Sequence, residues 1–184
     1  MKNLKEYLVP TITLFVICLV ATVLLGLTNN VTAPIIEQLA IETEIKSRQT
    51  VFASADSFGE ATILEDGTSV VAALDENGSV IGHVVVNIAK GYGGDISVMT
   101  GVDSDGKVTG INILSHSETA GLGAKATEDS FRDKFIGLIN GITVSKDKAG
   151  ENSIDAITGA TITSRAVVNA VNAAIEAAGG ENIG

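Results

Sequence analysis

The hydroxyl-rich segment from Asp155 to Ser164 has the residue types and spacing that point most directly to chemistry. It reads DAITGATITS and leads into an alanine- and valine-rich stretch with helical spacing, which predicts the start of a helix. Four of the seven residues from Thr158 to Ser164 carry hydroxyls, more than a helix cap requires. A helix start offers free N–H groups and a positive dipole end, so it suits a phosphate.

Two interpretations of this segment remain open on these residues alone. A Ser/Thr cluster before an apolar run most often supplies only an N-cap, for which Thr163 or Ser164 would serve. The alternative is a phosphate that is bound at the helix start or esterified to a threonine. Asp155, three residues before Thr158 and six before Thr161, favours the second interpretation.

Two upstream segments place glycine and polar residues where we expect strands to end. Residues 91–94 read GYGG, which permits unusual backbone angles and the close approach of a planar ligand, although a wide hairpin turn explains them equally well. Residues 115–123 read SHSETAGLG, a long polar loop with one leucine. Such loops often carry function, but this one alone would be unremarkable.

The elements that must position these segments follow from the hydrophobic period. An alternating pattern predicts strands over 69–75, 80–88, 95–103 and 107–115, with Asn77-Gly78 and Asp105-Gly106 at the turns. Residues 53–68 predict a loop or a short strand. We therefore expect an antiparallel meander.

Helical spacing marks the remaining elements. We expect a helix over 32–52, a second from Thr127 with Phe131, Phe135, Leu138 and Ile139 on one apolar stripe, and a last helix over about 164–178 that buries Val167, Val168, Val171 and Ile175. A short strand is expected near 142–145. Strands followed by helices without regular alternation predict an α+β fold, an antiparallel sheet with packed helices.

The N-terminus carries a candidate membrane span. No charged residue occurs from Tyr7 to Ile36, and 8–27 is a nearly continuous apolar run, with Pro10 expected in its first turn. A cleaved signal peptide, with cutting after Ala33, is the competing interpretation and would give a secreted soluble protein. We favour an anchor whose Lys2 and Lys5 keep the N-terminus in the cytoplasm. The expected division is an anchor over 1–30, a connecting helix and linker over 31–60, and an extracytoplasmic domain over 61–184.

Composition narrows the chemistry. The chain carries a formal net charge of −10, which argues against nucleic acid as a partner. The single cysteine, Cys18, lies in the apolar run, so neither a disulfide within one chain nor a thiolate metal site is expected. His83 and His116 are too few for a zinc or haem site. No nucleophile–base triad or carboxylate pair for hydrolysis stands out.

The pattern Asp-x-x-Thr-Gly-Ala-Thr, from Asp155 to Thr161, resembles the flavinylation motif of the FMN-binding domain family. In that family a flavin transferase moves FMN from FAD onto the last threonine as a phosphoester. The resemblance places that bond on Thr161. It implies that Asp155 and Thr158 shape the turn and help the transferase. Gly159 and Ala160 lie directly before Thr161 and belong to the same site.

The order of the three motifs resembles the G subunit of the Rnf ion-translocating electron-transport complex, over essentially the whole chain. The C subunit of the sodium-pumping NADH:quinone reductase is similar and stays an alternative. One departure is Ala120, where the family usually has proline.

The resemblance implies a membrane-anchored electron-transfer protein with covalent FMN, working with other membrane subunits of such a complex and without substrate chemistry of its own. The flavin ring would lie on Leu122. Its polar edge would meet Glu118, Thr119 and the N–H groups of Gly121 and Gly123, and Tyr92, followed by Gly93, is a stacking candidate. A non-catalytic flavin-binding sensor or scaffold would keep the same fold and anchor.

Overall fold

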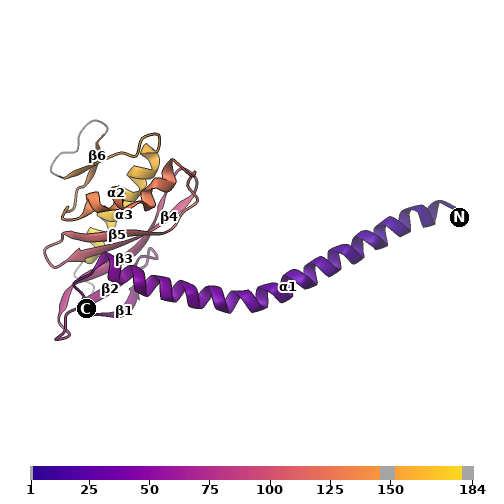
Figure 1. The fold of residues 1–184 in the computed structure, drawn as a ribbon, viewed down its shortest axis with the longest axis horizontal. Helices are drawn as coiled ribbons and strands as arrows, with labels where there is room; N and C mark the ends of the chain where they lie inside the picture. The colour runs from indigo at the N-terminus through magenta and orange to yellow at the C-terminus, as the bar shows by residue number, and fades with distance from the viewer. Residues whose placement is uncertain (1, 146–151, 180–184) are drawn as a thin grey trace. The chain divides into compact units, whose positions relative to one another are not determined.

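The computed structural model describes residues 2–145 and 152–179 (Figure 1). It forms two compact units, Met1–Thr43 and Glu44–Gly184. The elements are α1 (Lys2–Val51), β1 (Ser57–Ile63), β2 (Ser69–Leu74), β3 (Val80–Lys90), β4 (Asp95–Asp103), β5 (Val108–Ser115), the 3-10 turn η1 (Gly123–Thr127), α2 (Asp129–Arg132), η2 (Asp133–Phe135), β6 (Thr143–Ser145), β7 (Ser153–Asp155) and α3 (Thr161–Ala178).

Helix α1 contains a stretch that is long and apolar enough to cross a membrane, Tyr7–Ala33. The hydroxyls of Thr11, Thr13 and Thr22 bond back to carbonyls one turn earlier. The position of Pro10 is a correction. Because α1 runs unbroken from Lys2 to Val51, the apolar run and the helix expected over 32–52 form one helix, and Pro10 lies inside it instead of in its first turn.

The predicted antiparallel meander is confirmed, since β1 to β5 pair in chain order. The segment 53–68, expected as a loop or short strand, contributes the edge strand β1. Gly78 and Gly106 adopt positive φ at the two predicted turns, which is the backbone conformation that favours glycine there.

Both faces of the sheet are covered within the unit Glu44–Gly184. On one face Val51 and Phe52, at the end of α1, pack with Val84 and Met99. On the other face the apolar side of α3 packs on β3 and β4. This explains why β3 buries both Val84 and Val85, although neighbouring residues of a strand point to opposite faces.

A glycine platform, formed by Gly82, Gly101 and Gly110 on β3, β4 and β5, lets the end of α1 approach the sheet. A Cβ on Gly101 would collide with the Val51 carbonyl oxygen, and a Cβ on Gly82 would collide with the Phe52 ring. Gly101 and Gly110 pair directly across β4 and β5. Thr109 Oγ1 donates to the Val51 carbonyl at 2.6 Å, which satisfies one acceptor at the helix end.

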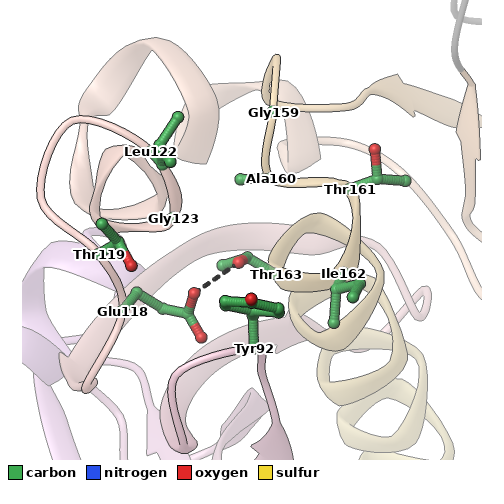
Figure 2. Close-up of a pocket in the computed structure, with 10 residues that line it drawn as sticks. All are labelled: Tyr92, Glu118, Thr119, Leu122, Gly123, Gly159, Ala160, Thr161, Ile162 and Thr163. Carbon is green, nitrogen blue, oxygen red and sulfur yellow. Dashed lines mark hydrogen bonds between the residues drawn. The ribbon is translucent and has the colours of Figure 1, made fainter.

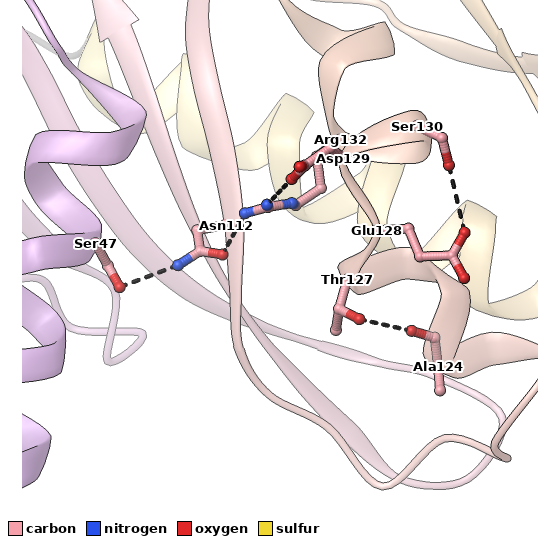
Figure 3. A network of polar contacts seen from close by, with 8 residues as sticks. All are labelled: Ser47, Asn112, Ala124, Thr127, Glu128, Asp129, Ser130 and Arg132. Atoms are coloured by element: carbon pink, nitrogen blue, oxygen red, sulfur yellow. Dashed lines mark hydrogen bonds and ion pairs between the residues drawn. The ribbon is translucent and has the colours of Figure 1, made fainter.

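A polar chain crosses the edge of the same face (Figure 3). Asn112 on β5 donates to Ser47 Oγ of α1 at 3.0 Å and accepts from Arg132 of α2 at 2.7 Å. Arg132 also pairs with Asp129. Side chains therefore join the end of α1 to β5 and α2, in addition to the apolar contacts.

Two helical regions and one short strand pair differ from the sequence prediction. The helix expected from Thr127 is three short pieces, η1, α2 and η2, which bury Phe131 and Phe135 but leave Ile139 exposed. The strand predicted at 142–145 is present as β6 and pairs in parallel with β7, which the sequence analysis did not predict. Helix α3 buries the predicted valines and isoleucine but begins three residues earlier, at Thr161.

Candidate functional site

A cavity of about 450 Å³ lies where the β3–β4 turn, the loop after β5 and the start of α3 meet (Figure 2). Its volume falls in the range of small-molecule and cofactor sites. Three segments far apart in the sequence thus build one site, and they are the three that the sequence analysis singled out. Its lining residues are Tyr92, Glu118, Thr119, Leu122, Gly123, Gly159, Ala160, Thr161, Ile162 and Thr163.

Eight of the twelve predicted site residues line this cavity, and four do not. Gly93 lies in the adjoining turn, where its N–H bonds to Glu118. Gly121 takes a positive φ beside Leu122 and is exposed. Asp155, at the end of β7, and Thr158 are both exposed and lie outside the cavity lining.

Ile162 and Thr163 line the cavity but were absent from the predicted site. The error came from the helix boundary. With α3 beginning at Thr161, these two residues belong to its first turn and follow the proposed attachment residue directly. An earlier boundary would have drawn attention to both.

The turn before α3 is held from inside by Ser164. Its hydroxyl accepts a hydrogen bond from the Ile157 N–H at 2.9 Å and donates one to the Ala160 carbonyl at 3.0 Å. The Ala160 N–H bonds to the Ile157 carbonyl, and Gly159 takes a φ of 78° between them. A residue with a Cβ would be strained at that φ, so the glycine suits the turn.

The start of α3 has no side-chain cap, which corrects the expectation that Thr163 or Ser164 caps it. The N-cap residue is Ala160, and no side chain in the described part of the chain caps the first N–H groups. The N–H of Ser164 makes the first bond to Ala160. The N–H groups of Thr161, Ile162 and Thr163 precede it, so they have no acceptor inside the helix.

The four hydroxyls of the segment separate by environment. Thr163 and Ser164 are buried, at 1% and 0% exposure, and both are hydrogen-bonded. Thr158 is exposed and lies outside the cavity lining. Thr161 is half-buried, lines the cavity and is the first residue of α3. Of the four, Thr161 alone combines access with a place at the uncapped helix start.

Glu118 lies across the cavity from Thr161. Its carboxylate joins its own loop to the β3–β4 turn and to the start of α3. One oxygen accepts from Thr163 Oγ1 at 2.7 Å (Figure 2), and the other accepts from the Gly93 N–H at 3.0 Å. Burial acts to raise the pKa of Glu118, but these bonds, a bond from the Tyr92 N–H and the nearby His116 together hold it below its ordinary value of 4.5. Glu118 is therefore an anion at neutral pH, and among the described residues that line the cavity it is the one charged side chain.

Apolar side chains form the rest of the rim. Tyr92, Ile162 and Leu122 are 74%, 54% and 44% exposed, although all three line the cavity. Leu122 approaches the turn before α3 closely, since a Cβ on Gly159 would lie 3.1 Å from its Cδ2. The residues that the structure describes contain no cluster of three potential metal ligands. The site thus combines apolar faces, one carboxylate and an uncapped helix start, which suits a planar ligand with a phosphate.

Comparison with known proteins agrees with this geometry. The family model of the FMN-binding domain matches residues 91–176, which include all three segments of the site. The G subunit of the Na⁺-translocating ferredoxin:NAD⁺ oxidoreductase complex of Acetobacterium woodii is 38% identical, over 89% of this chain and 87% of the relative. The chain belongs to this family of G subunits.

Other members of the G-subunit family match over similar lengths. The G subunit of the proton-translocating ferredoxin:NAD⁺ oxidoreductase complex of Clostridium ljungdahlii is 35% identical, over 95% of this chain and 93% of the relative. The resemblance stated from the three motifs, to the Rnf G subunits, is thereby confirmed.

Solved structures of related subunits share the fold of this member of the G-subunit family. The C subunit of the Na⁺-translocating NADH-quinone reductase of Parabacteroides distasonis has a TM-score of 0.50 at 24% identity, over 59% of each chain. NqrC of Shewanella oneidensis has a TM-score of 0.51 at 22% identity, over 66% of this chain and 65% of the other. The predicted α+β fold with an antiparallel sheet is confirmed.

Proposed function

We propose that this chain is a membrane-anchored electron-transfer subunit of an Rnf-type ion-translocating ferredoxin:NAD⁺ oxidoreductase, with FMN attached as a phosphoester to Thr161. The observation that carries the proposal is the uncapped start of α3, with Thr161 as its first residue beside the cavity. A hydroxyl-rich helix start that uses none of its hydroxyls as a cap leaves its N–H groups to an external anion.

The phosphate fits this helix start better as an ester than as a free ligand. The helix dipole contributes only about 0.3–1 kcal/mol to holding an anion. The chain is acidic overall, with a formal net charge of −10, so a freely bound flavin phosphate would be repelled. An ester bond retains the flavin whatever the strength of the helix dipole and of the charge repulsion. It leaves one negative charge on the phosphate for the N–H groups.

Attachment requires Thr161 to act as a nucleophile toward FAD. Thr161 Oγ1 forms a bond to the phosphorus on the FMN side, the bond between the two phosphates breaks, AMP leaves, and the hydroxyl proton passes to a base of a flavin transferase. Asp155 and Thr158 are exposed and lie outside the cavity lining, where a second protein reaches them more readily than the flavin does. We assign them to recognition by that transferase.

The cavity walls suit the isoalloxazine ring. Leu122 and Tyr92 offer apolar and aromatic faces, while Glu118 and Thr119 offer polar atoms to the ring edge. Bound FMN supplies the electron chemistry, and the chain supplies binding, orientation and electrostatics. The positive-inside rule supports an extracytoplasmic site for this domain, since Lys2 and Lys5 precede the span Tyr7–Ala33.

The test is to express the full chain with a flavin transferase and to inspect it after denaturing electrophoresis. We expect a fluorescent band and a mass increase of one FMN in the wild type, but neither in Thr161→Val. Thr161→Ser, which keeps a hydroxyl, should retain the flavin. Covalent flavin in Thr161→Val would refute the assignment, and colour lost on denaturation of the wild type would favour a non-covalent flavin sensor.

A further inference from the structure

The carboxylate of Glu118 is held in place from several directions. Thr163, in the first turn of α3, donates to one oxygen and the Gly93 N–H donates to the other. The Glu118 N–H in turn bonds to His116 Nδ1 at 3.2 Å. A side chain with this set of partners adopts one orientation.

Glycines close the space around this carboxylate. A Cβ on Gly123 would collide with Glu118 Oε2 and would lie 2.7 Å from Thr163 Oγ1. A Cβ on Gly91 would collide with the other carboxylate oxygen. The chain therefore brings its backbone close on two sides of the group, and Thr163 is the side-chain partner that fixes its position.

A fixed anion beside a redox group changes how readily that group accepts an electron. Glu118 is the one charged residue among the described residues that line the cavity, so no cation among them offsets it. Adding negative charge to a ring beside a carboxylate is unfavourable because like charges repel, most strongly where water is excluded.

We propose that Thr163 is a positioning residue, which fixes the Glu118 carboxylate beside the flavin ring and thereby lowers the reduction potential of the flavin. The inference rests on the proposed function, since it requires a flavin in this cavity. It gives Thr163 a role separate from attachment and from helix capping.

The protein that carries its flavin tests whether the Glu118 carboxylate lowers the reduction potential. The full chain is prepared with its flavin in detergent, and the reduction potential is measured by spectroelectrochemical titration. Glu118→Gln should favour reduction about tenfold, the scale of one unit charge at short range in a partly screened site. Thr163→Val should shift the equilibrium in the same direction, roughly threefold, because the carboxylate becomes mobile and hydrated. Thr163→Ser, which keeps the donor, should match the wild type.

The flavin-free protein tests separately whether Thr163 fixes the Glu118 carboxylate. In Thr163→Val the amide of Gly93 should exchange its hydrogen faster, and the carboxyl carbon signal of Glu118 in NMR should titrate at higher pH. Both should stay at wild-type values in Thr163→Ser. A wild-type potential in flavin-loaded Thr163→Val, or equal potentials in Thr163→Ser and Thr163→Val, overturns the inference while leaving the proposed function intact. Absence of flavin from the wild type contradicts the proposed function first.

Discussion

The Ser164 hydroxyl accepts a hydrogen bond from the N–H of Ile157, seven residues earlier, at 2.9 Å. This bond closes the turn that carries Thr161 to the edge of the cavity. The hydroxyl also donates to the Ala160 carbonyl, so one buried side chain satisfies a donor and an acceptor of the same turn.

Ser164→Ala should therefore destabilise the fold. It leaves the buried N–H of Ile157 without its partner, and an unsatisfied buried polar group costs about 1–3 kcal/mol. Thermal unfolding of the full chain in detergent, followed by circular dichroism, measures the change. Thr158→Ala, an exposed hydroxyl in the same segment, is the matched control and should fall within about 0.5 kcal/mol of the wild type. If Ser164→Ala and Thr158→Ala have the same free energy of unfolding, the hydrogen bonds of Ser164 do not stabilise the fold.

Gly159→Ala should cost more stability than Gly121→Ala. Both glycines have a φ near 78°, so each substitution forces alanine into the left-handed region at a cost of about 1–2 kcal/mol. A Cβ on Gly159 would also lie 3.1 Å from Leu122 Cδ2, whereas one on Gly121 would meet nothing within 4 Å. The difference in free energy of unfolding between the two variants, measured by chemical denaturation, reports the Leu122 contact. A Gly121→Ala variant less stable than Gly159→Ala would argue against that contact.

Gly101→Ala should destabilise the joint between α1 and the sheet. Its Cβ would collide with Thr109 Oγ1 and the Val51 carbonyl oxygen, and overpacking of this kind typically costs about 1–3 kcal/mol. Gly59→Ala on β1 provides the control, because its Cβ would make an ordinary 3.6 Å contact with Ala72. A shift in the unfolding midpoint is expected for Gly101→Ala, and no shift in either variant would contradict the tight approach of α1.

His83 should make the fold less stable in mild acid. Burial lowers its pKa below the ordinary value of 6.5, so the unfolded chain binds the proton more readily than the folded chain. The free energy of unfolding should therefore fall as pH drops from about 7 towards 5. In His83→Gln that part of the dependence should disappear, and identical pH profiles for variant and wild type would exclude His83 as its source.

The sheet could be predicted from the sequence because each strand carries its own signal. Alternating residues and Asn-Gly or Asp-Gly turns are local features, so the four strands from Ser69 to Ser115 were found with their turns. The glycine platform was not predicted, since Gly82, Gly101 and Gly110 acquire a common purpose only when three strands lie side by side. β7 was missed for a similar reason, because Ser153–Asp155 becomes a strand through its pairing with the distant β6.

The site shows the same division between local and distant information. The segments around Tyr92, Leu122 and Thr161 were singled out because each concentrates glycine or hydroxyls. Which hydroxyl bonds to Glu118 and which stays accessible depends on where α3 begins. A boundary error of three residues gave Thr163 and Ser164 a capping role that neither has.

The glycine platform has a practical consequence for anyone who wishes to separate the domain from its anchor. Val51 and Phe52 are almost completely buried against the sheet, and Ser47 is hydrogen-bonded to Asn112. Cutting the chain just before β1 would remove these side chains and open an apolar slot over Val84 and Met99. A water-soluble form should instead start at or before Glu44, keeping the last turns of α1 as part of the domain's own core.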